Sequence, residues 1–284
     1  MSEINPTLAQ AQRVEQRHPW GRAVWHVWGR NEPTHAQRTP LVLLHGGSGS
    51  WTHWLRNVAH LAKTHEVWAL DIPGFGDSDL PPSAQDADDL VPYVETILQM
   101  QFGDAALDVI GFSFGGMLAG MIAAHQPARW RTLVLVGVPG LGLFGKDLPM
   151  RGMRANMSQA EQRDVHRDNL RVMMLSDACV VDDALIDLQQ NNVARDRLRR
   201  RRIARTDVLL PLQNKWTCAV HGIWGERDAL YRDTLAQVPK VLHRLQSFHV
   251  IPTAGHWVQY EAPEAFHACV DQILNNSRSP NSVK

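Results

Sequence analysis

The sequence has little of several features that mark whole classes of protein. It holds three cysteines, Cys179, Cys218 and Cys269, which lie far apart in the chain. Their odd number and wide spacing suit neither a disulfide framework nor a cysteine-rich metal site, so we expect free thiols in a reducing cytoplasm. The His-Glu-x-x-His pattern of zinc hydrolases is missing as well. We therefore expect no metal and no cofactor.

An excess of charge and long apolar runs are also lacking. Lys and Arg total 29, and Asp and Glu total 29, so the formal net charge is zero. This balance gives no reason to expect nucleic acid or an anionic membrane as a partner. No stretch approaches the roughly 18 apolar residues of a membrane span, and the first residues do not resemble a signal peptide. The expected partner is a small-molecule substrate, and a homodimer stays open.

What the sequence does contain is an alternation of strand and helix patterns. An antiparallel strand pair is expected within 12–28, strands at 40–45, 66–71, 107–112 and 131–137, and helices at 51–63, 88–101 and 114–125. Such alternation predicts an α/β fold with a mostly parallel sheet. The pattern breaks at about Pro139 and resumes at Ala219. We therefore expect a core of residues 1–138 and 213–274, a helical cap of 139–212, and a disordered tail of 275–284.

The most informative motif is Gly111-Phe112-Ser113-Phe114-Gly115-Gly116, between a strand pattern and a helix of small residues. A Gly-x-Ser-x-Gly turn from strand to helix strains the serine backbone and exposes its hydroxyl. Side chains at Gly111 and Gly115 would collide in such a turn. We interpret Ser113 as a nucleophile. A glycine-rich turn with an incidental serine is the alternative.

A nucleophilic serine needs a base and an acid that orients the base, in the chain order serine, acid, histidine. His256 follows a strand pattern and Gly255, and Asp228 follows the strand pattern that ends near Gly225. Both therefore fall past the carboxyl ends of strands, where active sites of open parallel sheets lie. Glu226 and Asp233 compete with Asp228, which we favour. Four other histidines are interpreted as structural or surface residues: His45, His125, His221 and His249.

A glycine-rich loop, His45-Gly46-Gly47-Ser48-Gly49-Ser50, follows the strand pattern at 40–44. Such a loop lets a backbone N–H approach a substrate oxygen, so Gly47 and Phe114 are predicted to form an oxyanion hole. The alternative, a phosphate-binding loop, is weakly supported because no Gly-Lys-Ser/Thr follows. The predicted substrate-binding residues are Gly46, Ser48, Phe112, Phe144 and Trp257.

Together these motifs resemble the α/β-hydrolase superfamily, with Asp71-Ile72-Pro73-Gly74-Phe75-Gly76-Asp77-Ser78 as a further landmark. The resemblance runs from about Trp20 to about Leu274. It implies an eight-stranded, mostly parallel sheet with a helical cap. It also implies Ser113 as nucleophile, Asp228 as acid and His256 as base. A serine at this position argues against dehalogenase and epoxide hydrolase chemistry, which uses an aspartate nucleophile.

Residues 135–142 and 255–261 resemble the meta-cleavage-product hydrolases, which cleave carbon–carbon bonds in ring-fission products. The chain departs from that branch at Phe112, where the branch usually carries Asn, and at 47–50, which is not Gly-Pro-Gly-Ala. Asn191 and Asn192 lie near the expected place of the branch's cap arginine.

A dienoate substrate needs a cationic partner for its carboxylate, and the sequence offers Arg195 or Arg197 as candidates. The arginine-rich run 195–202 otherwise reads as a solvated helix, with 199–202 facing outward. The preferred function is therefore hydrolysis of a small, largely apolar ester or lactone. Carbon–carbon hydrolysis is the alternative, and a ligand-binding protein on the same scaffold is an alternative of another class.

Overall fold

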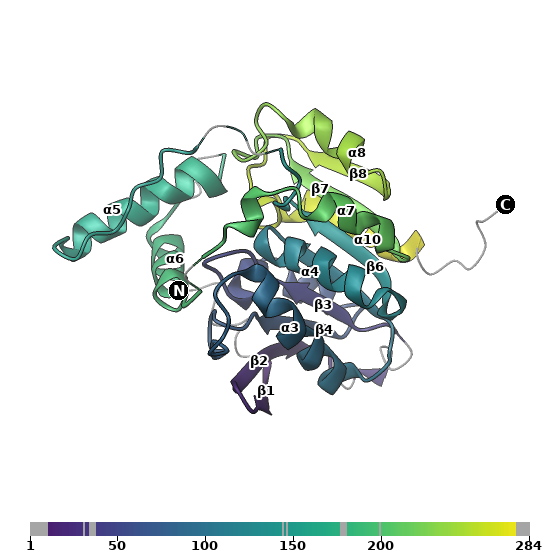
Figure 1. Ribbon diagram of the computed structural model, residues 1–284. Helices are drawn as coiled ribbons and strands as arrows, with labels where there is room; N and C mark the ends of the chain where they lie inside the picture. Colours follow the sequence, from purple (N-terminus) through teal and green to yellow (C-terminus); the bar gives the residue numbers. More distant parts are fainter. Residues whose placement is uncertain are drawn as a thin grey trace.

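The computed structural model describes residues 11–30, 32–33, 38–143, 145, 147–176, 181–198 and 200–276. Eight strands form one sheet in the order β1-β2-β4-β3-β5-β6-β7-β8 (Figure 1). They are β1 (Gln12–His18), β2 (Gly21–Trp28), β3 (Leu41–Leu44), β4 (Val67–Asp71), β5 (Leu107–Phe112), β6 (Trp130–Val136), β7 (Ala219–Gly225) and β8 (Leu245–Ile251). β2 is antiparallel to β1 and β4, and every other pair is parallel. The predicted sheet is thus confirmed.

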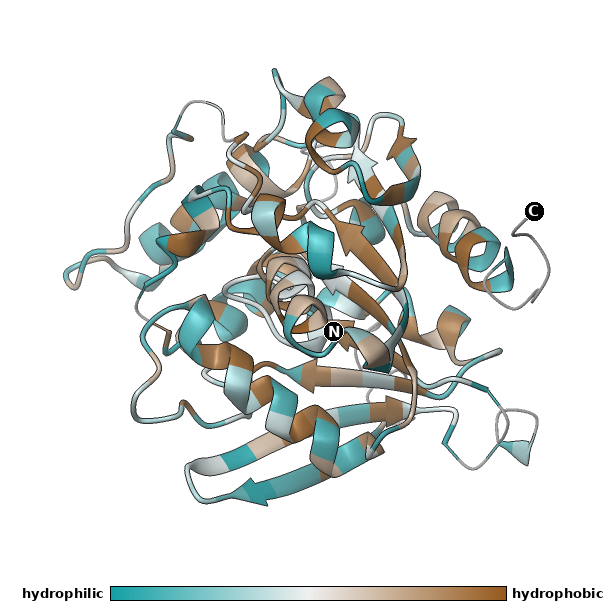
Figure 2. Ribbon diagram, turned by 45° about the vertical axis from the view of Figure 1, so that its right-hand side comes forward, coloured by the Kyte–Doolittle hydropathy of each residue, from teal (hydrophilic) through white to brown (hydrophobic). Residues whose placement is uncertain are grey.

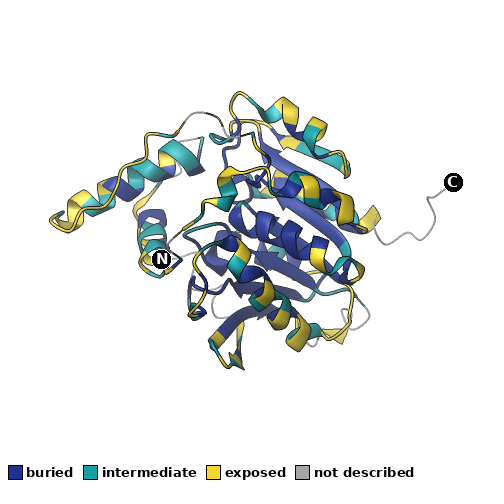
Figure 3. Cartoon of the chain, in the orientation of Figure 1, coloured by how far each residue is buried: buried dark blue, intermediate teal, exposed yellow. Residues whose placement is uncertain are grey.

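Helices cover both faces of this sheet, which explains the continuous apolar run of β3. Val42 and Leu44 pack in one core cluster with residues of α3 (Ala87–Phe102) and α4 (Phe114–His125). Leu41 and Leu43 pack in a second cluster with residues of α10 (Pro263–Asn276). This division follows from the two-residue period of a strand. The central strands and α4 are accordingly hydrophobic in Figure 2 and buried in Figure 3, whereas the edge strand β1 is mainly hydrophilic and exposed.

The other helices are short. They are α2 (Val58–Leu61), α5 (Gln159–Asn169), α6 (Asp183–Ala194), α7 (Leu209–Leu212), α8 (Val238–Val241) and α9 (Val258–Glu261), with 3₁₀ turns at Trp51–Trp54, Pro127–Arg129, Ile203–Arg205, Gln213–Lys215 and Leu235–Gln237 and a π turn at Leu170–Met174. Among the described residues, no helix has the length and apolar character needed to cross a membrane.

Two boundary predictions are wrong. A continuous helix over 51–63 does not form, since tertiary bonds hold its first half in another shape. The N–H of Trp51 donates to Asp71 Oδ1 at 2.8 Å, and the side-chain amide of Asn57 donates to the carbonyl of Gln259 at 2.8 Å. The tail begins later than expected, because α10 continues through residues 275 and 276. The rest of the expected tail lies outside the described residues.

Residues 139–212 lie between β6 and β7, and we call them the cap. The described part of the cap forms helices and no strand. α5 extends away from the sheet, and most of its residues are intermediate or exposed, with Val165 and His166 buried (Figures 1 and 3). Backbone bonds join the cap to the core on two sides: Trp257 N–H donates to the carbonyl of Met174 at 2.7 Å, and Arg197 N–H donates to that of Gly74 at 2.8 Å. We call the two cap segments that make these bonds, around Met174 and around Arg197, the arms of the cap.

His221 on β7 predicts how stability responds to acid. Its Nδ1 lies 2.8 Å from Ser247 Oγ on β8. Burial, with a contribution from neighbouring His249, lowers the pKa of His221 from 6.5 to about 4. Because the unfolded chain binds this proton more readily, the contribution of neutral His221 is present above pH 6.5 and is lost as the pH falls toward 4.

The substitution His221→Asn should therefore reduce the loss of stability over that pH window. The measurement is the Tm at several pH values in the window, compared with wild type. The matched control is His243→Asn, at an exposed histidine, which should leave the acid dependence as in wild type. An acid-induced loss of equal size in His221→Asn and wild type would contradict this account.

Candidate active site

Ser113 occupies a strained turn between β5 and α4. Its φ is +49° and its ψ is −120°, and its N–H donates to the carbonyl of Val136 at 2.8 Å. A Cβ at Gly111 would lie 2.4 Å from the Cα of Gly116, and one at Gly115 would lie 2.3 Å from the carbonyl oxygen of His45. These distances are too short for any side chain, so the turn requires both glycines.

The structure brings Ser113, His256 and Asp228 together. Ser113 Oγ lies 3.0 Å from His256 Nε2, and His256 Nδ1 lies 2.8 Å from Asp228 Oδ2. A carboxylate only accepts hydrogen bonds, so Nδ1 carries the ring proton and Nε2 accepts from the serine. The three residues follow β5, β7 and β8, whose carboxyl ends share one edge of the sheet. This geometry can support proton transfer from the serine to the imidazole.

Asp228 is buried, and its other oxygen, Oδ1, accepts from the N–H of Leu230 at 3.0 Å. Both oxygens are therefore held. The two competing acids lie elsewhere: Glu226 Oε2 accepts from the N–H of Thr253 at 2.9 Å, and Asp233 is exposed. Of the three candidate acids, the structure places Asp228 against His256.

Two buried histidines shape the loop that begins at Gly46. His45 Nε2 accepts from the N–H of Ile72 at 3.0 Å, and its Nδ1 donates to the carbonyl of Gly46 at 2.8 Å. His53 Nδ1 accepts from the N–H of Gly46 at 3.1 Å. Burial lowers the pKa of both rings, that of His53 well below its ordinary value, where the charges of His45 and His256 contribute too. Both rings are thus neutral, as these acceptor nitrogens require.

His45 is structural, as its interpretation from the sequence had it. The role of His53 was missed. The only available signal was its position in Trp51-Thr52-His53-Trp54, directly after the glycine-rich loop. The contact between His53 and Gly46 joins two separate segments of the chain. No pattern of consecutive residues indicates such a contact.

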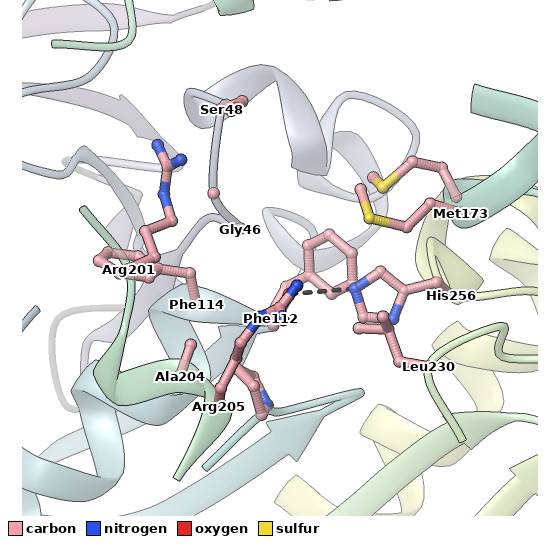
Figure 4. A pocket seen from close by; sticks show the side chains of 14 residues that line it. Gly46, Ser48, Phe112, Phe114, Met173, Arg201, Ala204, Arg205, Leu230 and His256 are labelled. Carbon is pink, nitrogen blue, oxygen red and sulfur yellow. Dashed lines mark hydrogen bonds between the residues drawn. The ribbon is translucent and has the colours of Figure 1, made fainter. Parts of the chain in front are cut away.

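A cavity of about 280 Å³ opens beside Ser113 and His256 (Figure 4). Met173 and Leu230 lie on the His256 side of it, and Ser48 and Arg201 lie on the other. Its lining is mainly apolar and consists of Gly46, Gly47, Ser48, Phe112, Ser113, Phe114, Pro139, Met173, Met174, Arg201, Ala204, Arg205, Leu230 and His256. The predicted oxyanion residues Gly47 and Phe114 are therefore next to the serine.

Of the predicted substrate-binding residues, Gly46, Ser48 and Phe112 line this cavity. The prediction for Trp257 is wrong. Its side chain is fully buried, its Nε1 donates to the carbonyl of His53 at 3.0 Å, and it stacks on Tyr260. The Trp257 ring therefore packs in the core next to His256 in the sequence and does not line the cavity. Phe144 lies outside the described residues.

The described residues of the range 195–202, where a solvated helix was expected, form no helix, and α6 ends at Ala194. Arg195 pairs with Asp77 at 3.0 Å, and Arg197 donates to the carbonyl of Gly76 at 3.0 Å, so both are bound to a core loop. Arg201, expected to face outward, lines the cavity instead. Arginine favours helices in isolation, but here tertiary bonds to the core decide the backbone.

Comparison with known proteins agrees with this architecture. Residues 41–268 match the model of the Alpha/beta hydrolase family. The chain belongs to the alpha/beta hydrolase family. A 2-hydroxymuconate semialdehyde hydrolase of Pseudomonas sp. (strain CF600) is 29% identical over 258 residues, which cover 83% of this chain and 86% of that protein. The predicted resemblance to meta-cleavage-product hydrolases is thus confirmed at the level of similarity.

Two further comparisons widen the range of relatives. The dihydrolipoyllysine-residue acetyltransferase component of an acetoin cleaving system of Pseudomonas putida is 29% identical over 80% of this chain, which spans only 60% of that protein. The structure of an N-acyl homoserine lactonase complexed with N-butanoyl homoserine superposes with a TM-score of 0.73. It is 20% identical and covers 96% of this chain and 100% of its own, which shows a shared fold. This chain is therefore an alpha/beta hydrolase enzyme, and its named relatives include a hydrolase and an acetyltransferase component.

The site predicts which carboxylate orients His256. Asp228→Asn should lower kcat by about 10⁴-fold, because an amide donating to Nδ1 would favour the wrong imidazole tautomer. Glu226→Gln, at an exposed carboxylate in the same turn, is the matched control and should stay close to wild type. The measurement is kcat on a p-nitrophenyl ester. A larger loss in Glu226→Gln than in Asp228→Asn would contradict the assignment.

Proposed function

We propose that this protein is a serine hydrolase that cleaves small, largely apolar carboxylic esters or lactones. The observation that carries the proposal is the continuous set of hydrogen bonds from Ser113 through His256 to Asp228, at the wall of a mainly apolar cavity. Such an array makes a serine hydroxyl nucleophilic near neutral pH. We further propose that the enzyme is cytoplasmic and acts without a metal or cofactor.

In the proposed mechanism, Ser113 Oγ attacks the substrate carbonyl while His256 Nε2 takes the hydroxyl proton. Asp228 holds the ring and stabilises the imidazolium that forms. The N–H groups of Gly47 and Phe114 stabilise the developing oxyanion. His256 then donates its proton to the leaving alcohol, which leaves an acyl group on Ser113. A water molecule, deprotonated by His256, releases the acid and restores the serine.

The charges around the cavity support an ester or lactone as the substrate. The two arginines among the described lining residues have acidic partners: Arg201 pairs with the mostly buried Asp196, and Arg205 makes a largely exposed pair with Asp147 at 3.0 Å. Phe112, beside the nucleophile, contacts the His256 ring with a centroid distance of 5.0 Å and adds no polar group. A neutral substrate avoids the cost of a buried carboxylate without a free cation.

Carbon–carbon hydrolysis is the second candidate. The observation that favours it is the similarity to a 2-hydroxymuconate semialdehyde hydrolase along most of both chains. Against it stand Arg195 and Arg197, the expected carboxylate partners, since both are bound to the loop around Gly76. A ligand-binding protein is the least supported alternative, because the hydrogen bonds from Ser113 through His256 to Asp228 support catalysis.

The nucleophile assignment predicts the effect of Ser113→Ala. The variant should lose at least about a thousandfold in kcat because the attacking oxygen is removed. It should keep the wild-type Tm because the surrounding packing is unchanged. A suitable control is Ser247→Ala, a serine that also contacts histidines but lies on β8 away from the cavity. Turnover of Ser113→Ala at the wild-type rate would rule out the serine mechanism.

The substrate assignment predicts an order of catalytic efficiencies. Measured as kcat/KM on purified protein, p-nitrophenyl butyrate or an acyl homoserine lactone should exceed a 2-hydroxy-6-oxodienoate ring-fission product. The reason is that the dienoate must bury a carboxylate among arginines that are already paired. A dienoate processed more than about tenfold better than the best ester, a difference above 1 kcal/mol in transition-state binding, would favour the carbon–carbon reaction instead.

A further inference from the structure

Asp196 of the cap is bonded directly to the loop that carries Gly47. Ser48 Oγ donates to Asp196 Oδ2 at 2.6 Å, and the N–H of Leu198 donates to Oδ1 at 3.2 Å. The guanidinium of Arg201 pairs with the same carboxylate. The Asp196 side chain is only 10% exposed. Hydrogen bonds to a charged group in such a poorly hydrated place are stronger than ordinary surface contacts.

The backbone of Ser48 needs such a contact. Its φ is +49°, a left-handed conformation that a residue with a side chain adopts only at an energetic cost. A residue in that region keeps its conformation only where the surroundings hold it. Here the bond from Ser48 to Asp196 provides a hold from outside the loop.

The peptide group between Gly46 and Gly47, one residue before Ser48, is the one that matters for the proposed catalysis. The carbonyl of Gly46 and the N–H of Gly47 belong to the same peptide group. His45 Nδ1 holds that carbonyl at 2.8 Å, so one end of the peptide is fixed by the core. Ser48 follows directly on Gly47, so its bond to Asp196 restrains the other side. The direction of the Gly47 N–H thus depends on a core histidine and a cap aspartate.

A second cap contact shows that this region of the cap is firmly joined to the loop. Asn192 is buried, and its Oδ1 accepts from Ser50 Oγ at 2.9 Å. Its Nδ2 donates to Thr52 Oγ1 at 2.9 Å. The Arg201 guanidinium lies over Phe75 and Phe114, at 5.4 and 5.9 Å from the ring centroids. Asp196 is therefore held in place from both sides of its own segment.

We propose that Asp196 is a positioning residue for the oxyanion hole. It holds Ser48, and through Ser48 it aims the Gly47 N–H at the oxygen that becomes negatively charged. The inference rests on the proposed function, in which Ser113 is the nucleophile and Gly47 is an oxyanion donor. It assigns to the cap a part in transition-state stabilisation, in addition to enclosing the cavity.

The test uses a fluorophosphonate probe, which needs no knowledge of the natural substrate. Ser113 Oγ attacks phosphorus, fluoride leaves, and the phosphoryl oxygen takes the place of the substrate oxyanion. Asp196→Ala should slow the second-order labelling of the full-length protein by about 10- to 100-fold, somewhat less than the complete loss of one oxyanion donor. Asp196→Asn should stay within about threefold of wild type, because an amide oxygen still accepts from Ser48.

The matched control is Asp187→Ala, at an exposed α6 aspartate that pairs with Arg163 of α5. It should label at the wild-type rate. Ser48→Ala removes the same hydrogen bond from the other partner and should slow labelling to the same extent. The double variant should be no slower than either single one, since both remove one interaction. Ser48→Ala also decides the question if Asp196→Ala does not fold.

Ester kinetics separate positioning from substrate binding. On p-nitrophenyl butyrate, Asp196→Ala should lower kcat and change KM by less than about twofold, the pattern of an interaction made in the transition state. Labelling of Asp196→Ala and Ser48→Ala at the wild-type rate, with wild type modified at Ser113, would overturn this inference alone. An equal loss in Asp187→Ala would overturn it too. Wild type that is not modified at Ser113 would overturn the proposed function, and this inference with it.

Discussion

The left-handed backbone at Ser113 is the constraint on which the site depends. A φ of +49° turns the chain from β5 into α4 within one residue and leaves the hydroxyl at the edge of the sheet. The turn exists only because helix and neighbouring loop approach more closely than any Cβ allows at Gly111 and Gly115. The parallel order of β5, β6, β7 and β8 then delivers Asp228 and His256 to the same edge. Packing of the sheet thus holds the strained Ser113 beside His256.

The cap is bonded to two of the loops that surround Ser113. One of its arms reaches the histidine loop, where Ser176 N–H donates to Glu261 Oε2 at 3.0 Å and Gly255 N–H donates to the same oxygen at 2.8 Å. The other arm reaches the glycine-rich loop through Asn192 and Asp196. Each arm therefore contacts a loop that carries one part of the proposed chemistry. A change in the cap can act on the reaction without touching the substrate.

Much of this could be predicted from the sequence, where the signal is local. The strained serine turn needs glycines two residues away on each side, and β3 needs a continuous apolar run, so both leave a mark in consecutive residues. The order of serine, acid and histidine also follows from the fold. Asp228 could be preferred to Glu226 from the sequence, but its contact with His256 at 2.8 Å came only with the structure.

What could not be predicted depends on contacts between distant segments. His53, Asp196 and Arg201 have no local pattern that separates them from other polar residues of the chain. Trp257 beside the histidine and the arginines near 200 have patterns that suit several environments, and the structure places Trp257 in the core and Arg201 at the cavity. Residues 51–63 have a helical pattern, yet the hydrogen bonds that Trp51 and Asn57 donate to Asp71 and Gln259 interrupt the helix. Tertiary partners decide each of these cases.

The difference between the core and the cap also explains why membership of the family does not identify the substrate. The core supplies the strained turn and the proposed acid and base, Asp228 and His256, which would serve any reaction that begins with attack on a carbonyl carbon. The cap supplies Met173, Met174, Arg201 and Ala204 to the cavity wall. Its Arg195 and Arg197, the candidate partners of a substrate carboxylate, are instead bonded to the core loop around Gly76. With its cavity arginines paired to Asp196 and Asp147, the cap offers a dienoate carboxylate no unpaired partner among the described lining residues. In the proposed function these pairs favour a neutral ester, and the choice between the two bonds is a property of the cap and not of the shared core.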